Sequence, residues 1–155
     1  MIPITLTRYD VENLYIGLER LSSCSIPQAT RYAIAKTLSA LRPEVDATNT
    51  AFPRPEQTDP PEKHIAWNQG RHGHMLEKVE VSVHPPKELP EVSLDDLVRL
   101  LPDKPLPIVH QFNQALVASL VPWVDAREQA APEPMPEGNG GFRNPIPQTT
   151  PITIR

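Results

Sequence analysis

The sequence YDVENLYIGLERLSSCSIPQATRYAIAKTLSALR, residues 9–42, decides the fold, because hydrophobic spacing and turn residues predict one structure there. In residues 9–21, apolar side chains recur every three or four positions and so share one helix face: Val11, Leu14, Tyr15, Leu18 and Leu21. After a polar turn at residues 22–25, a second such set follows: Ile26, Thr30, Ala33, Ile34, Thr37, Leu38 and Leu41. The stretch therefore predicts a helical hairpin.

Local chemistry suggests where the second helix begins and ends. Ser25 and Gln28 have the spacing of a capping box, and Pro27 suits the first helical turn. Pro43 disfavours helical backbone at Arg42. We therefore expect this helix to begin at the capping box and to end before Pro43.

Two segments outside the hairpin alternate apolar and other residues, as strands do. Residues 2–6 alternate Ile and Leu with Pro and Thr, and residues 79–83 alternate Val with Glu and Ser. A strand needs a partner for its backbone groups. We expect residues 79–83 to pair with residues 2–6, with Ile152–Ile154 or with a neighbouring subunit.

Two further helices are predicted in the second half of the chain. Ser93 is a helix N-cap followed by Asp95 and Asp96, whose charges suit the positive end of a helix dipole better than a catalytic carboxylate pair. A longer helix should begin near Leu106 or Pro107 and end at Pro122. Its buried stripe is expected to be Ile108, Val109, Phe112, Leu116 and Leu120, with His110, Gln111 and Gln114 outside it.

Proline shapes the rest of the chain. Twenty of 155 residues are proline, more than twice the usual share of about 5%. We expect an irregular Pro-rich insertion at 43–75 and an extended Pro/Gly-rich C-terminal arm at 125–155. The predicted fold is α+β and mainly helical: a domain at 1–124, with the helical hairpin, a small β-sheet and two further helices, followed by the arm.

Composition limits the possible partners. The net charge of −4 argues against direct sequence-specific nucleic-acid binding. No apolar run approaches the roughly 20 residues that cross a bilayer, and the N-terminus lacks a signal-peptide pattern. The single cysteine, Cys24, fits a reducing compartment. We therefore expect an intracellular or virion protein that binds no membrane.

Residues able to do chemistry are few. The densest group of metal-ligand types is His64, His72, His74, Glu77 and His84, but its spacing is looser than that of structural zinc sites. Cys24 lies in a turn with no base nearby in sequence. We therefore assign no catalytic residue, metal, cofactor or small-molecule substrate, and keep a metal-dependent enzyme as a third hypothesis.

Large apolar residues in otherwise polar segments are candidates for binding a partner. Those assigned to this role are Trp67, Trp123, Phe142, Ile146, Ile152 and Ile154. For the two tryptophans the alternative is that they cover the domain's own core.

The order of these segments resembles a family of small tailed-bacteriophage proteins of unknown function. The resemblance covers about two thirds of the chain and includes a Tyr-x-Ile-Ala-Lys motif in the second helix, matched by Tyr32, Ile34, Ala35 and Lys36. Pro43, Pro53 and Pro55 depart from the family pattern, and the C-terminal arm is unmatched. The resemblance implies phage origin and transfers no catalytic residue.

Together these features predict a non-enzymatic structural or accessory protein of a phage particle, in the head-tail region, capsid or tail. Its extended segments would bind other virion proteins in a homo- or hetero-oligomeric assembly, formed in the host cytoplasm. The alternative is an intracellular assembly chaperone or an inhibitor of a host protein.

Overall fold

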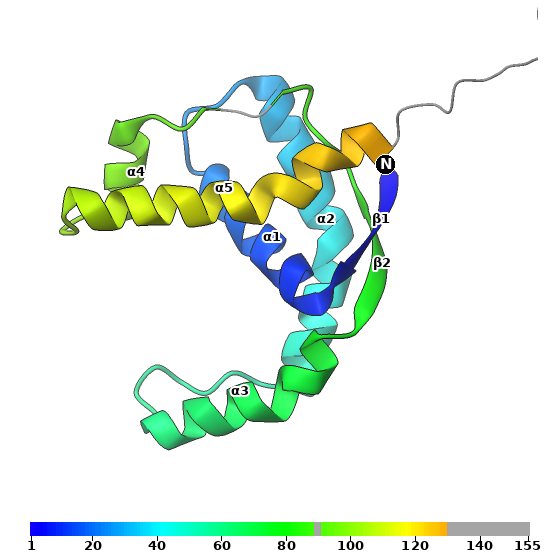
Figure 1. Cartoon of the computed structure of the whole chain (residues 1–155), viewed down its shortest axis with the longest axis vertical. Helices are drawn as coiled ribbons and strands as arrows, with labels where there is room; N and C mark the ends of the chain where they lie inside the picture. The colour runs from blue at the N-terminus through cyan, green and yellow to red at the C-terminus, as the bar shows by residue number, and fades with distance from the viewer. Residues whose placement is uncertain (89–90, 130–155) are drawn as a thin grey trace, which may run out of the picture.

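The computed structural model describes residues 1–88 and 91–129, which form five helices and a two-stranded sheet (Figure 1). The fold is α+β and mainly helical, as predicted. The elements are β1 (Ile2–Thr7), α1 (Arg8–Leu21), α2 (Gln28–Ala51), α3 (Pro61–Met75), β2 (Lys78–Val83), α4 (Leu94–Leu100) and α5 (Leu106–Gln129).

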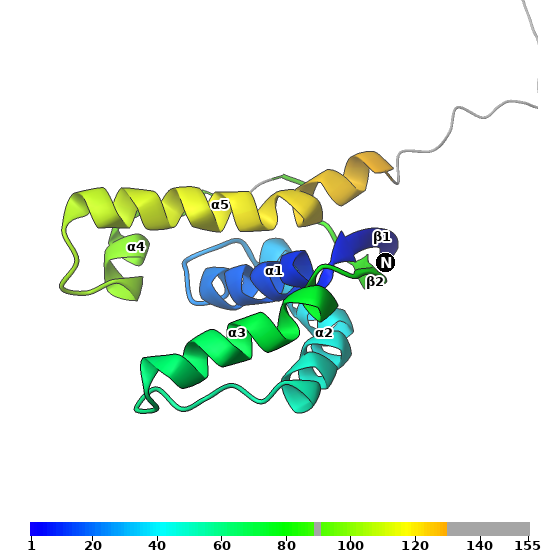
Figure 2. The same cartoon turned by 60° about the horizontal axis from the view of Figure 1, so that its bottom comes forward.

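The predicted helical hairpin, α1 and α2, forms the centre of the molecule. Figure 2 shows α1 between α5 on one side and α2 on the other. The predicted stripes face this core, and the buried members are Val11, Leu14, Leu18, Leu21, Thr30, Ala33, Ile34, Thr37 and Leu41. Apolar burial along these stripes therefore holds the layers together.

The predicted capping box at Ser25 and Gln28 is wrong. The N-cap of α2 is Pro27, which makes no side-chain capping bond. Ser25 instead donates its backbone N–H to Oδ2 of Asp96 in α4, at 2.9 Å. A partner distant in sequence has replaced the local one, and spacing alone could not reveal it.

The two predicted strands pair with each other. β1 and β2 are antiparallel, with Ile4 opposite Val81, and these two side chains are buried. Ile152–Ile154, the other partner considered within the chain, lies outside the described residues. At the end of β2, the buried Thr37 hydroxyl accepts the backbone N–H of His84 at 2.9 Å. Thr37 thereby joins α2 to the sheet.

Residues 43–75 are largely helical, so the expected irregular insertion is wrong. α2 continues through Pro43 to Ala51, and α3 fills residues 61–75. An interior proline costs about 3 kcal/mol, because it removes a backbone hydrogen bond. Contacts beyond Pro43 offset this cost: Thr48 is buried, and Arg8 Nε donates to Glu44 at 2.8 Å. Residues 52–60 form the irregular connection.

α5 likewise continues through Pro122, which was expected to end it, and extends into the start of the expected arm. Trp123 and Ala126 are fully buried beyond the proline, so core packing compensates for the lost hydrogen bond. Figure 1 shows the C-terminal part of α5 at an angle to the rest. The other residues of the expected arm, 130–155, lie outside the described part of the chain.

α3 projects from the body and is anchored at its C-terminal end (Figures 1 and 2). The buried Arg71 guanidinium donates to both carboxylate oxygens of Glu12 in α1, each at 3.1 Å. Met75 is fully buried one turn later. This end therefore positions the whole helix.

Candidate interaction surface

One face of α5 is open and uncharged. This face, which we call the outer face, consists of five exposed residues: Leu106, His110, Gln114, Val117 and Val121. They share one side of the helix, because separations of four and eleven residues are close to one and three turns. Leu106, Val117 and Val121 remain 55%, 40% and 46% exposed. Residues 106–124 contain no Asp, Glu, Lys or Arg.

A neighbouring side of α5, roughly 110° around the helix from the outer face, packs in the core. Val109, Leu116 and Leu120 of the predicted stripe are buried there, and Phe112 is partly buried. The prediction was wrong for Ile108, which is 40% exposed. Trp123 is fully buried, and its Nε1–H donates to the carbonyl of His84 at 2.7 Å. Since packing fixes α5, the outer face is presented to solvent in a defined orientation.

The outer face is suited to burying apolar area against a partner. A partner covering it would desolvate no full charge on the helix, and desolvating an unpaired charge costs several kcal/mol. Exposed valines and a leucine supply apolar contact, while His110 and Gln114 supply hydrogen-bonding groups. Sequence reasoning placed His110 and Gln114 correctly outside the stripe but missed Val117 and Val121. Both valines are apolar residues that lie outside the predicted buried stripe, and this pattern could have indicated an exposed apolar surface.

A groove of about 450 Å³ runs between α1 and α5. The helices approach closely where Gly17 faces Ser119. Asp10, Asn13 and Arg20 line the α1 side of the groove, and the Arg20 guanidinium lies 5.1 Å from the centre of the Phe112 ring. A polar rim therefore borders the uncharged helix, as is common at protein interfaces.

α4 adds a second exposed apolar pair, Leu94 and Val98, one helical turn apart. The predicted Ser93 cap is confirmed, since its hydroxyl accepts the backbone N–H of Asp96. Asp96 is buried and also accepts hydrogen bonds from Ser25 N–H and from Arg99. These bonds, the one from Ser25 first, hold the pKa of Asp96 below the ordinary aspartate value. The sequence predicted that Asp96 lies near the positive end of the helix dipole, but it did not predict the hydrogen bond between Asp96 and Ser25.

The two tryptophans assigned to partner binding have different surroundings. Trp123 belongs to the core, so its assignment to a partner surface is corrected: its ring packs in the core and its one donor is already bonded. Trp67 on α3 is half-buried, with the Arg54 and Arg71 guanidinium carbons 4.5 and 3.9 Å from its ring centre. Its Nε1–H donates to the carbonyl of Phe52. The other assigned residues, Phe142, Ile146, Ile152 and Ile154, lie outside the described residues.

The histidines occupy separate local environments. His72 Nδ1 lies 3.1 Å from the Tyr9 hydroxyl, His64 Nε2 lies 3.1 Å from the Glu56 carbonyl, and His74 is 3.8 Å from Glu77. The ring of His84 meets that of Tyr32 edge-on. Within residues 1–88 and 91–129, no three His, Cys, Asp or Glu side chains gather closely enough to hold a metal ion.

Cys24 is buried between α1 and α2. Burial, and to a lesser extent the charge of Asp96, raise the pKa of its thiol. The thiol donates to the Arg20 carbonyl at 3.6 Å. These surroundings favour the neutral thiol over the nucleophilic thiolate.

The chain matches no known family model, no curated protein and no solved structure. Among the described residues, no helix is both long enough and apolar enough to cross a membrane.

Proposed function

We propose that this chain is a non-enzymatic structural or accessory protein of a bacteriophage particle, in the head-tail region, capsid or tail. The observation that carries the proposal is the outer face of α5, where three exposed apolar residues lie on a helix without a charged side chain from 106 to 124. Contiguous exposed apolar patches on soluble proteins mark interaction sites, and Val117 and Val121, one helical turn apart, form the apolar centre of this face. The phage origin rests on the resemblance that includes Tyr32, Ile34, Ala35 and Lys36.

In this proposal the outer face packs against a neighbouring virion subunit. Burying apolar surface contributes about 25 cal/mol per Å², so even a modest contact stabilises an assembly in which it is repeated. Phe142, Ile146, Ile152 and Ile154 would add apolar anchors from the arm, and Trp67 would serve as the anchor on α3. The protein would be assembled into virions in the host cytoplasm.

The alternative is an assembly chaperone or an inhibitor of a host protein that stays out of the finished particle. The projection of α3 favours it, because that helix extends from the body (Figure 1) and carries Ile65, whose side chain is 55% exposed. Mass spectrometry of purified particles of the encoding phage separates the two. A fixed copy number per particle supports the structural role, and absence from particles supports the alternative.

Charge substitutions on the outer face test the proposed surface. Val117→Glu combined with Val121→Glu should leave the unfolding transition nearly unchanged, because both side chains are exposed, yet reduce incorporation into particles at least tenfold, equivalent to about 1.4 kcal/mol. Ala47→Glu, an exposed position on α2, is the matched control and should incorporate normally. Normal incorporation of the double variant would overturn this use of α5.

A further inference from the structure

A second groove lies at the N-terminal end of α2. Its volume is about 690 Å³, and it is lined by Pro27, Tyr32 and Ala33 from the α2 side and by His84, Pro85 and Pro86 from the chain after β2. Tyr32 is 57% exposed, and its ring centre lies 5.6 Å from that of His84. Aromatic rings beside an open groove are how several domains bind proline-rich segments in the polyproline II conformation.

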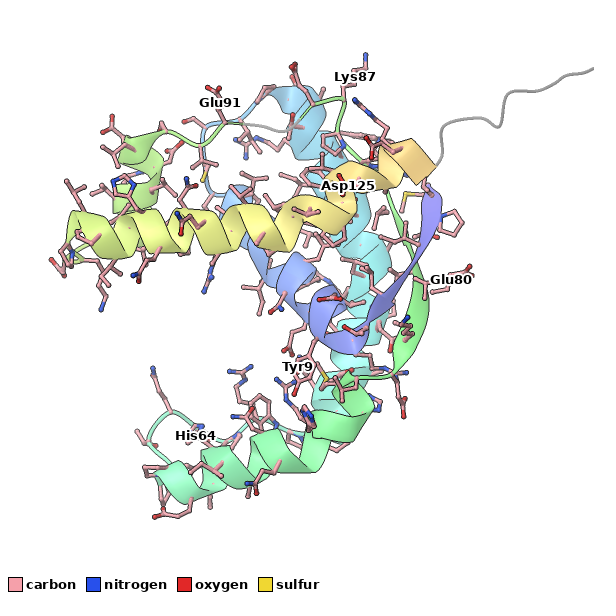
Figure 3. The ribbon with its side chains drawn as sticks, in the orientation of Figure 1. Tyr9, His64, Glu80, Lys87, Glu91 and Asp125 are labelled. Carbon is pink, nitrogen blue, oxygen red and sulfur yellow. The ribbon has the colours of Figure 1, made fainter. Side chains whose placement is uncertain are left out.

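The end of α5 lies beside this groove. Arg127 donates to the carbonyl of Pro86, a groove residue, at 3.0 Å. Figure 3 shows Asp125 of α5 and Lys87, which lines the groove, at the same end of the molecule. The chain therefore leaves its last described helix next to the groove, and the sequence that follows, residues 130–137, is AAPEPMPE.

We propose that Pro132–Pro136 binds this groove of its own chain, with proline rings against Tyr32. In the proposed polyproline II conformation, which rises about 3.1 Å per residue, the three steps from Gln129 to Pro132 would span about 9 Å. Arg127, two residues before Gln129, already bonds the groove residue Pro86. The groove residues Lys87, Glu88 and Glu91 sum to a net charge of −1, and the segment carries Glu133, so apolar contact and not charge attraction selects the segment.

This inference goes beyond the proposed function, because it concerns how the arm leaves the domain. With Pro132–Pro136 held on the groove, Gly138–Gly141 follows as a glycine-rich connection, and Phe142 and the residues after it remain available to a neighbouring subunit. The groove would thus set the direction in which the arm starts.

A spin label on the full chain tests the proposal. Cys24→Ala removes the native thiol, and Glu137→Cys carries the label. The labelled, ¹⁵N-enriched chain is diluted with an excess of unenriched, label-free chain, so that the label acts only on amides of its own molecule. The amide signals of Tyr32, Ala33 and Lys87 should then lose intensity, while those of α3 stay sharp. Adding Tyr32→Ala should restore the intensities, whereas Tyr32→Phe, which keeps the ring, should not.

Loss of intensity only when the label is on a different molecule from the ¹⁵N would overturn binding within one chain, yet would leave the proposed function standing. No loss in either arrangement would also overturn the inference. A second measurement needs no change at Cys24: replacing Pro132, Pro134 and Pro136 by Ser in the full chain should shift the Tyr32 and Lys87 amide resonances. Unchanged resonances would contradict the proposal.

Discussion

At the scale of single residues, Asp96 connects parts of the chain that are far apart in sequence. Its carboxylate accepts the backbone N–H of Ser25 at 2.9 Å and a hydrogen bond from Arg99, while its own amide is capped by Ser93. The side chain is buried, so these bonds are shielded from water. One carboxylate therefore fixes both the start of α4 and the turn between α1 and α2.

The lowered pKa of Asp96 predicts loss of stability in acid. Because the folded state favours the carboxylate, its contribution is complete above the unfolded-state pKa of about 3.9 and is lost as pH falls through the lower folded-state value. Asp96→Asn should remove this dependence and lower stability at pH 6. Urea unfolding of both proteins between pH 6 and 3 measures it. Parallel stability curves for the two proteins would contradict the prediction.

At the scale of elements, the crossing of α1 and α5 depends on one glycine. A Cβ at Gly17 would lie 2.3 Å from Ser119 Oγ, while its next neighbours are at 3.4 and 3.5 Å, in ordinary contact. The absent side chain lets α5 lie close on the hairpin and so sets the position of the outer face.

Gly17→Ala should therefore destabilise the protein by up to about 2 kcal/mol, because displacing the Ser119 hydroxyl costs about 1–3 kcal/mol and the gain in helix propensity is about 1 kcal/mol. In a Ser119→Ala background the obstructing hydroxyl is gone, and the same substitution should become neutral or stabilising. Thermal or urea unfolding of the four proteins gives the comparison. An effect of the same sign and size in both backgrounds would exclude this explanation.

At the scale of the whole molecule, the folded body extends to the end of α5. Ala126 is fully buried, and Arg127 bonds the carbonyl of Pro86. The boundary between domain and arm expected at residue 125 thus falls inside a packed helix. Truncations meant to remove the arm should start at residue 130.

Two truncated chains test where the body ends. A chain ending at Val124 should be less stable than one ending at Gln129 by about 2–4 kcal/mol, because it loses the Ala126 methyl and the Arg127 hydrogen bond and exposes Trp123 at a frayed end. Urea denaturation followed by circular dichroism measures the difference. Equal midpoints would show that residues 125–129 add nothing to the fold.

Local patterns in the sequence determined the hairpin stripes, the valine strand, the Ser93 cap and the start of α5, because periodicity and capping depend on residues a few positions apart. They also placed His110 and Gln114 on the open side of α5. The tertiary structure alone decided that α2 and α5 pass through Pro43 and Pro122, that Ser25 bonds Asp96, and that Trp123 is buried. At the two prolines, core contacts outweigh a local cost of about 3 kcal/mol each, and at Ser25 a distant carboxylate replaces a local cap. Such contacts between residues distant in sequence exist only once the chain has folded.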